Sequence, residues 1–297
     1  MQIGSWSIDS LKVRIPLRKV KILDESINEI IARVSERTGE VLESKENTKA
    51  SRDEKGIKTT FSIEQRATKF DTIPYLIILV NAKQLGSRYF EGITTHNLTQ
   101  LHKYLMSLDI AQFSLKELLR SECTDIDIKK DFEAQDERMK EVFKAMKDNA
   151  TPSEDYDKGC KLFWQKDNKG LQFNKRETTK YLTAPFLKIY SKTSDLLTKS
   201  NIFAMAHLDN IPQDLWRIEY TIKNKKHLQA FNIGNTFSDL LSLSQEQLEA
   251  ISQKSLKAVL EKRIKPLMDS DENIPPKDLI VVNCLIISWT QVINGVS

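Results

Sequence analysis

The sequence is poor in cysteine, has no long apolar run and lacks a phosphate-binding loop, and each shortage excludes a class of protein. Its three cysteines, Cys123, Cys160 and Cys284, stand far apart and form no Cys-x-x-Cys pair. This excludes a disulfide framework and fits a reducing compartment. No stretch reaches the roughly 18 consecutive apolar residues of a membrane-spanning helix. No GxxxxGK(S/T) motif is present, which argues against a fused helicase.

What the chain does contain is typical of a folded protein with one large domain or two smaller ones. Of its 297 residues 40% are hydrophobic and 29% are charged, a balance that excludes a disordered chain. The N-terminus has no charged-then-apolar signal pattern, so we expect a cytoplasmic protein.

Basic residues are concentrated in one part of the chain. The net charge is only +4, but residues 158–199 hold ten Lys or Arg against three acidic residues, with aromatic residues interleaved. This mixture suits single-stranded nucleic acid, because cations meet phosphates and rings stack on bases. The alternative is a solvated face over a sheet. The side chains that we predict to bind DNA are Arg14, Trp164, Lys180, Lys188 and Arg217.

Alternating apolar and polar residues predict strands in several segments. These segments are residues 8–23, 59–70, 124–132, 183–192 and 215–223, and the nearly all-apolar run 73–82 predicts a central strand buried on both faces. Helical spacing and caps predict helices at 96–108, 114–119 and 243–268. We therefore expect an α+β fold, in which a mostly antiparallel sheet of about five strands carries helices on one face and leaves the other open to DNA. Residues 1–236 would form the main domain and residues 237–297 a C-terminal helical segment.

Two stretches near the N-terminus give less regular patterns. Residues 24–34 place Ile27, Ile30, Ile31 and Val34 at helical spacing, which predicts a helix. Residues 43–58 are polar and without periodicity, which predicts a flexible loop.

Three of the predicted strands carry side chains suited to phosphate chemistry. Tyr190 and Lys192 are two residues apart, so both point to one face of a strand. This pair is either a nucleophile beside its cation or an ordinary surface pair. Asp125 and Asp127 face away from two isoleucines on another strand, as expected either for an edge in water or for a metal or catalytic site. Glu219 stands on the polar side of a third.

The order of these segments resembles the rolling-circle replication initiators of the filamentous-phage gene II type and the related small-plasmid Rep type, within the HUH-like tyrosine endonucleases. The segments that carry the resemblance lie between residues 8 and 232. They are IDSLKVRIP, a buried strand running into KQLG, TDIDIKKD, FLKIYSK and LWRIEYTIK.

The resemblance implies a metal-dependent endonuclease that nicks one strand at an origin, becomes joined to the 5′ end and later rejoins the ends. It places Tyr190 at the nucleophile position and Lys192 at the lysine that follows it. It places Asp127, Glu219 and Asp131 at acidic positions that would bind Mg²⁺ or Mn²⁺, which prefer oxygen ligands. The implied partners are single-stranded or supercoiled origin DNA, a host helicase and a host DNA polymerase, in the cytoplasm of a bacterial cell.

The sequence departs from that family in one respect. The wider class carries a His-hydrophobic-His metal motif, and the four histidines here form no such pair, which leaves a third metal ligand unassigned. Tyr181 is a rival nucleophile nine residues before Tyr190. The alternative function is a non-catalytic initiator or regulator that binds an origin without cutting it.

Overall fold

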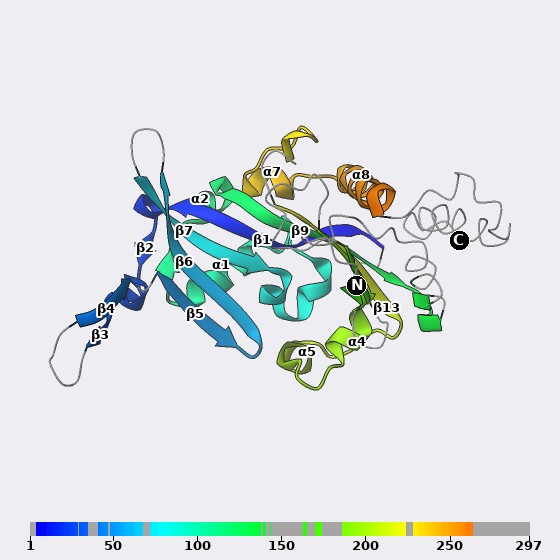
Figure 1. Ribbon diagram of the computed structural model, residues 1–297, viewed down its shortest axis with the longest axis horizontal. Coiled ribbons are helices and arrows are strands. Elements are labelled where there is room, and N and C mark those ends of the chain that lie inside the picture. Colours follow the sequence, from blue (N-terminus) through cyan, green and yellow to red (C-terminus); the bar gives the residue numbers. More distant parts are fainter. Residues whose placement is uncertain are drawn as a thin grey trace.

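A nine-stranded antiparallel sheet forms the centre of the computed structural model, which describes residues 4–28, 30–34, 41–46, 48–67, 72–137, 139–140, 143, 163–164, 170–173, 186–223 and 228–263. The strand order is β10-β11-β12-β13-β9-β1-β7-β6-β5. Figure 1 labels β13, β9, β1, β7, β6 and β5 of this sheet. The strands are β1 (Trp6–Pro16), β5 (Lys49–Glu54), β6 (Ile57–Ala67), β7 (Thr72–Asn81), β9 (Glu122–Glu133), β10 (Phe163–Trp164), β11 (Gly170–Phe173), β12 (Phe186–Ser191) and β13 (Leu215–Ile222).

Short helices and two small strand pairs surround this sheet. The α-helices are α1 (Leu98–Ser107), α2 (Leu115–Arg120), α4 (Lys192–Leu196), α5 (Ile202–His207), α7 (Phe237–Leu241) and α8 (Gln245–Arg263). The 3-10 helices are η1 (Leu17–Lys19), η2 (Glu25–Asn28) and η3 (Ala82–Glu91). The small pairs join β2 (Lys21–Ile22) to β8 (Ala111–Gln112) and β3 (Ile30–Val34) to β4 (Val41–Glu46). Among the described helices, none is long and apolar enough to cross a membrane.

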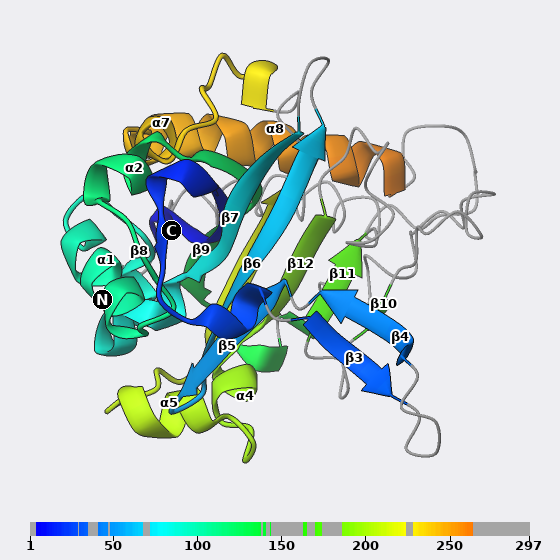
Figure 2. The same ribbon diagram turned by 90° about the vertical axis from the view of Figure 1, so that its left-hand side faces the viewer.

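The α+β class predicted from the sequence is confirmed, with a sheet larger than the five strands expected. Helices also contact both faces of it, since α8 and the α4–α5 segment lie on opposite sides (Figure 2). Tyr220 of β13 meets Ser252 of α8 at 2.8 Å, whereas Arg217 of the same strand donates to Tyr89 of η3 at 2.7 Å. Because successive strand residues alternate in direction, Arg217 and Tyr220 mark opposite faces.

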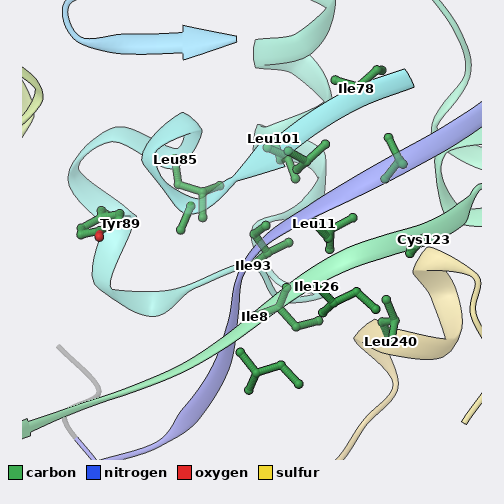
Figure 3. Close-up of a cluster of buried hydrophobic side chains, with 14 of the residues drawn as sticks. Ile8, Leu11, Ile78, Leu85, Tyr89, Ile93, Leu101, Cys123, Ile126 and Leu240 are labelled. Carbon is green, nitrogen blue, oxygen red and sulfur yellow. The ribbon is translucent and has the colours of Figure 1, made fainter. Parts of the chain in front are cut away.

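The alternation in β1 works as predicted and fixes the centre of the core. Leu11, Val13 and Ile15 are fully buried, whereas Lys12 and Arg14 between them are half-buried. Part of the cluster that these residues join is shown in Figure 3. Burying each such side chain stabilises the fold by about 1.5–3 kcal/mol. The strand therefore holds its place between β7 and β9 through its apolar face.

The helix predicted for residues 24–34 is wrong. Residues Glu25–Asn28 form the 3-10 helix η2, and Ile30–Val34 form β3, which pairs with β4. The apolar residues fitted a helical period, but all four are β-branched, and three of them occur within a five-residue stretch. Such residues lose rotamer freedom in helices and favour strands.

The loop predicted for residues 43–58 is also wrong. Val41–Glu46 form β4, and Lys49–Glu54 form β5 at the edge of the large sheet, paired with β6. An edge strand needs little apolar surface, and charged residues there protect the edge from pairing with other chains. A polar, aperiodic sequence is therefore compatible with a strand in this position.

Two predicted helix starts are confirmed by their caps. The Ser114 hydroxyl accepts the backbone N–H of Glu117 at the start of α2. Ahead of α8, Ser244 and Gln247 exchange both hydrogen bonds of a capping box. Ahead of Tyr190, β10 and β11 pair antiparallel. Residues 264–297, including the remainder of the predicted C-terminal helical segment, lie outside the described part of the chain.

Gly92 ends η3 at a point where only glycine fits. Its φ is +69°, and a Cβ there would lie 2.5 Å from Ser7 Oγ and 2.9 Å from the Ile8 carbonyl oxygen. We expect Gly92→Ala to lower the free energy of unfolding by about 2–4 kcal/mol, from backbone strain and overpacking. Urea unfolding would measure this.

Gly4→Ala is the matched control for that measurement. Gly4 also has a positive φ, +96°, but a Cβ there has no neighbour within 4 Å. We expect Gly4→Ala to lower the free energy of unfolding through backbone strain alone, by about 1–2 kcal/mol. Equal losses in the two variants would show that the close approach to β1 is unimportant.

Candidate active site

Three adjacent strands, β12, β13 and β9, bring a block of polar side chains together. In the cross-strand register Tyr190 lies opposite Arg217, and Arg217 lies opposite Asp131. Directly opposite residues share a face of the sheet. Side chains from three separate strands therefore form one continuous row.

A second row lies beside the first, two residues along each strand. Lys188 lies opposite Glu219, and Glu219 lies opposite Lys129. Lys188 forms an ion pair with Glu219, and it remains the most exposed of the three at 28%. Glu219 is thus flanked by a lysine on each neighbouring strand.

The Tyr190 hydroxyl donates a hydrogen bond to Glu219 Oε2 at 3.2 Å, and both side chains are more than nine-tenths buried. Burial raises the pKa of Tyr190 well above its usual range, and the Glu219 charge adds to this increase. Burial opposes ionisation of Glu219 too, but the Lys188 charge and hydrogen bond outweigh it and hold the Glu219 pKa below its usual range. An ionised carboxylate therefore faces a protonated phenol.

Lys192 lies close to Tyr190, but not on the same strand as the two-residue spacing predicted, because β12 ends at Ser191. It is the first residue of α4, and its Nζ lies 5.5 Å from the centroid of the Tyr190 ring and 5.3 Å from that of Tyr89. Its ammonium group pairs with Asp195 at 2.6 Å. Ser191 caps α4 by accepting the backbone N–H of Ser194, which turns the chain directly after the strand.

Arg217 lies at the centre of a buried ion network. Its guanidinium donates to both oxygens of Asp131, at 2.6 and 3.0 Å, and to Asp9 at 3.0 Å. Lys129 reaches Asp131 at 2.5 Å and the Phe90 carbonyl at 2.7 Å. Burial alone would raise the pKa of Asp131, but Arg217 and Lys129 outweigh it and hold that pKa well below its usual range.

The three predicted metal ligands do not come together. Asp127 and Asp131 are four residues apart on one strand, about 13 Å at 3.3–3.4 Å per residue. Asp127 accepts hydrogen bonds from the Ser10 and Thr221 hydroxyls, and Asp131 pairs with Arg217 and Lys129. The described residues contain no group of three or more His, Cys, Asp or Glu side chains suited to a metal ion. The predicted ligand set therefore does not fit Mg²⁺ or Mn²⁺ in this arrangement.

The predicted DNA-binding residues have different locations. Lys188 lies in the site, but Arg217 is fully buried and saturated with partners, so it is not available to DNA. Arg14 lies five residues beyond Asp9 on β1, roughly 17 Å along the strand. Trp164 belongs to β10, two strands away from Tyr190. Lys180 and the rival nucleophile Tyr181 lie outside the described residues.

Sequence reasoning missed Asp9, Lys83 and Tyr89, which also belong to the site. Asp9 lies within the IDSLKVRIP segment, and Lys83 within the KQLG turn, now seen as the start of η3. Tyr89 lies near the end of η3 and contacts Arg217. Lys129 could have been found, because it continues the alternation between Asp127 and Asp131. The η3 residues lack a strand period that would assign them to a face.

No protein-family model matches the chain, and the curated proteins give no significant match to it. The resemblance to rolling-circle replication initiators therefore stays a prediction, and the proposed function rests on the arrangement of side chains in this site.

Proposed function

We propose that this protein is a replication initiator that nicks and rejoins single-stranded origin DNA through a phosphodiester bond to Tyr190. The observation that carries the proposal is the hydrogen bond from the Tyr190 hydroxyl to Glu219. A nucleophile of this kind needs a positioned base that takes its proton. Glu219 holds that position, and its lowered pKa keeps it ionised at neutral pH.

The proposed step transfers a phosphoryl group without net hydrolysis. Tyr190 Oη attacks the scissile phosphorus as Glu219 accepts the phenolic proton. The new bond joins Tyr190 to the 5′ phosphate, and the bond from phosphorus to the 3′ oxygen breaks. The departing 3′ oxygen takes up the proton that Glu219 received, and it becomes a free hydroxyl, which can prime synthesis. In the reverse step a 3′ hydroxyl attacks the phosphotyrosine and frees Tyr190.

Positive charge around the nucleophile supports this chemistry. Phosphoryl transfer depends on positioning and on neutralising negative charge. Lys188 pairs with Glu219 and is partly exposed, and Lys192 lies over the Tyr190 ring. Since the predicted metal ligands do not assemble, each proposed step uses only these side chains. A requirement for Mg²⁺ or Mn²⁺ stays a prediction.

The proposal extends to partners and location. The substrate would be single-stranded or supercoiled origin DNA, and a host helicase and DNA polymerase would extend the freed 3′ end. These processes would place the protein in the cytoplasm of a bacterial cell. Proteins that bind DNA in this way lose affinity steeply with salt, so assays belong at a stated ionic strength.

The proposal is tested by trapping the covalent intermediate. Purified protein is mixed with single-stranded oligonucleotides that tile its own replicon, with and without Mn²⁺. Products are separated on a denaturing gel, and a shifted band is digested for peptide mass. We expect a DNA adduct on the peptide that carries Tyr190. The two metal conditions test the predicted metal requirement in the same experiment.

Two other outcomes of this experiment would change the proposal. An adduct on Tyr181 would keep the class of enzyme and reassign the nucleophile. A folded protein that binds these oligonucleotides and forms no adduct in either condition would refute the nicking activity in favour of a non-catalytic origin-binding initiator.

A further inference from the structure

Lys83 lies at the border of the Tyr190 site, although it belongs to a different part of the chain. Its Nζ lies 5.4 Å from the centroid of the Phe203 ring. The Phe203 and Tyr89 rings pack edge to face with centroids 5.2 Å apart. Lys192 in turn lies over the rings of both Tyr89 and Tyr190. Lys83 and Lys192 therefore flank one aromatic group beside the nucleophile.

The two other cations of this group have carboxylate partners. Arg217 pairs with Asp131 and Asp9, and Lys192 pairs with Asp195. Lys83 forms no ion pair with any residue in the described ranges, and its ammonium group lies over the Phe203 ring. Asp9 and Asp195 act on Lys83 only through their more distant charges.

This arrangement is unfavourable for Lys83 in the protein alone. The side chain is half-buried, and burial lowers its pKa, with a further decrease from the positive charge of Lys192. A buried cation is normally paired, because desolvating it without a partner costs free energy. Proteins retain such unfavourable features mainly at functional sites. A negatively charged ligand beside Lys83 would pair with its ammonium group and offset this desolvation cost.

We propose that Lys83 binds a backbone phosphate of the DNA strand that enters the Tyr190 site. The inference rests on the proposed function for its ligand, since it names DNA as the source of the phosphate. Lys83 would contact one phosphate as a point charge and hold the strand in position beside Lys192. It would act in binding and positioning, whereas Tyr190 and Glu219 would perform the transfer.

The test compares Lys83→Met with Lys103→Met, an exposed lysine on α1. Binding of a single-stranded oligonucleotide from the replicon is followed by fluorescence anisotropy over a range of salt concentrations, and adduct formation is timed separately. One lost phosphate contact should lower the slope of log K against log salt by about 0.7. We expect that change and an adduct rate about tenfold lower in Lys83→Met. Lys103→Met should match the wild type in both.

Thermal unfolding guards against a folding defect. Removing a half-buried cation that has no ion-pair partner among the described residues should leave the melting temperature unchanged or raise it. Lys83→Arg, which keeps the charge, should restore most of the salt slope. If Lys83→Met proves unfolded, Lys83→Gln is used in the same assays.

The outcomes separate this inference from the proposed function. Unchanged salt slope and adduct rate in Lys83→Met would overturn the role of Lys83 and leave Tyr190 as the nucleophile. Wild-type binding without any adduct would overturn the nicking activity, and the salt slope would then decide the role of Lys83 alone. Wild-type protein that binds no single-stranded DNA would overturn both.

Discussion

A Tyr190→Phe variant is expected to form no covalent adduct with DNA while it still binds the same oligonucleotides. The substitution removes one oxygen atom, which is the attacking atom of the proposed step. It also removes the hydrogen bond to Glu219, a loss of about 1 kcal/mol in the free energy of unfolding. The adduct band on a denaturing gel measures the reaction, and fluorescence anisotropy measures binding of the same oligonucleotides.

Tyr220→Phe is the matched control. Tyr220 is also fully buried and also loses a hydroxyl contact, with Ser252 at 2.8 Å, but on the opposite face of the sheet. It should lose similar stability and form the full amount of adduct. An undiminished adduct in Tyr190→Phe would remove Tyr190 from the mechanism.

The rate of adduct formation in this assay should also depend on pH. Burial and the charge of Glu219 raise the pKa of Tyr190, so its hydroxyl is protonated at neutral pH and must lose its proton during the reaction. Because ionised Glu219 takes that proton in the proposed step, the rate of adduct formation should be level through the neutral range and fall in acid as Glu219 becomes protonated. A rate that instead rises steeply with pH through the neutral range would argue against Glu219 as the base.

An Asp131→Asn variant is expected to lose about 3–5 kcal/mol in the free energy of unfolding at neutral pH, because breaking a buried ion pair leaves its partners unpaired. Arg217 would keep Asp9 and the Tyr89 hydroxyl, and Lys129 would keep the Phe90 carbonyl. Both cations are essentially inaccessible to water. Urea unfolding at neutral pH measures the loss.

The effect should depend on pH in a definite direction. Arg217 and Lys129 hold the Asp131 pKa below its unfolded value, so this carboxylate stabilises the fold above about pH 4, and the contribution fades as pH falls further. The difference between wild type and Asp131→Asn should shrink in acid. Asp125→Asn, on the same strand, removes a partly exposed ion pair with Lys12 and should lose less than about 1 kcal/mol. Equal losses in the two variants would contradict a structural role for the Arg217 network.

The strands of the site could be predicted from the sequence, and their neighbours could not. The alternation in TDIDIKKD and LWRIEYTIK puts Asp127 and Asp131 on one face, and Arg217 and Glu219 on another strand's face. A period of two says nothing about which strands pair. The structure places β9 between β1 and β13, and this decides that Asp131 meets Arg217.

The predicted roles of the acidic residues depended on that pairing. Sequence reasoning treated Asp127, Asp131 and Glu219 as free carboxylates that a metal could collect. In the fold each has hydrogen-bonding partners from neighbouring strands, because an unpaired charge at this depth would be costly. Lys83 and Tyr89 were missed for a different reason, since η3 has no strand period that assigns its residues to the site.

The strand order has a consequence for when the site exists during synthesis. Tyr190 lies on β12, but its partner Glu219 lies on β13, which also joins β12 to β9. A nascent chain that has not yet released residues 215–222 from the ribosome has Tyr190, the proposed nucleophile, without Glu219, its proposed base, and without the neighbouring strand β13. Under the proposed mechanism, a growing chain could therefore form no adduct with DNA until β13, the last strand of the described sheet in the sequence, has been made.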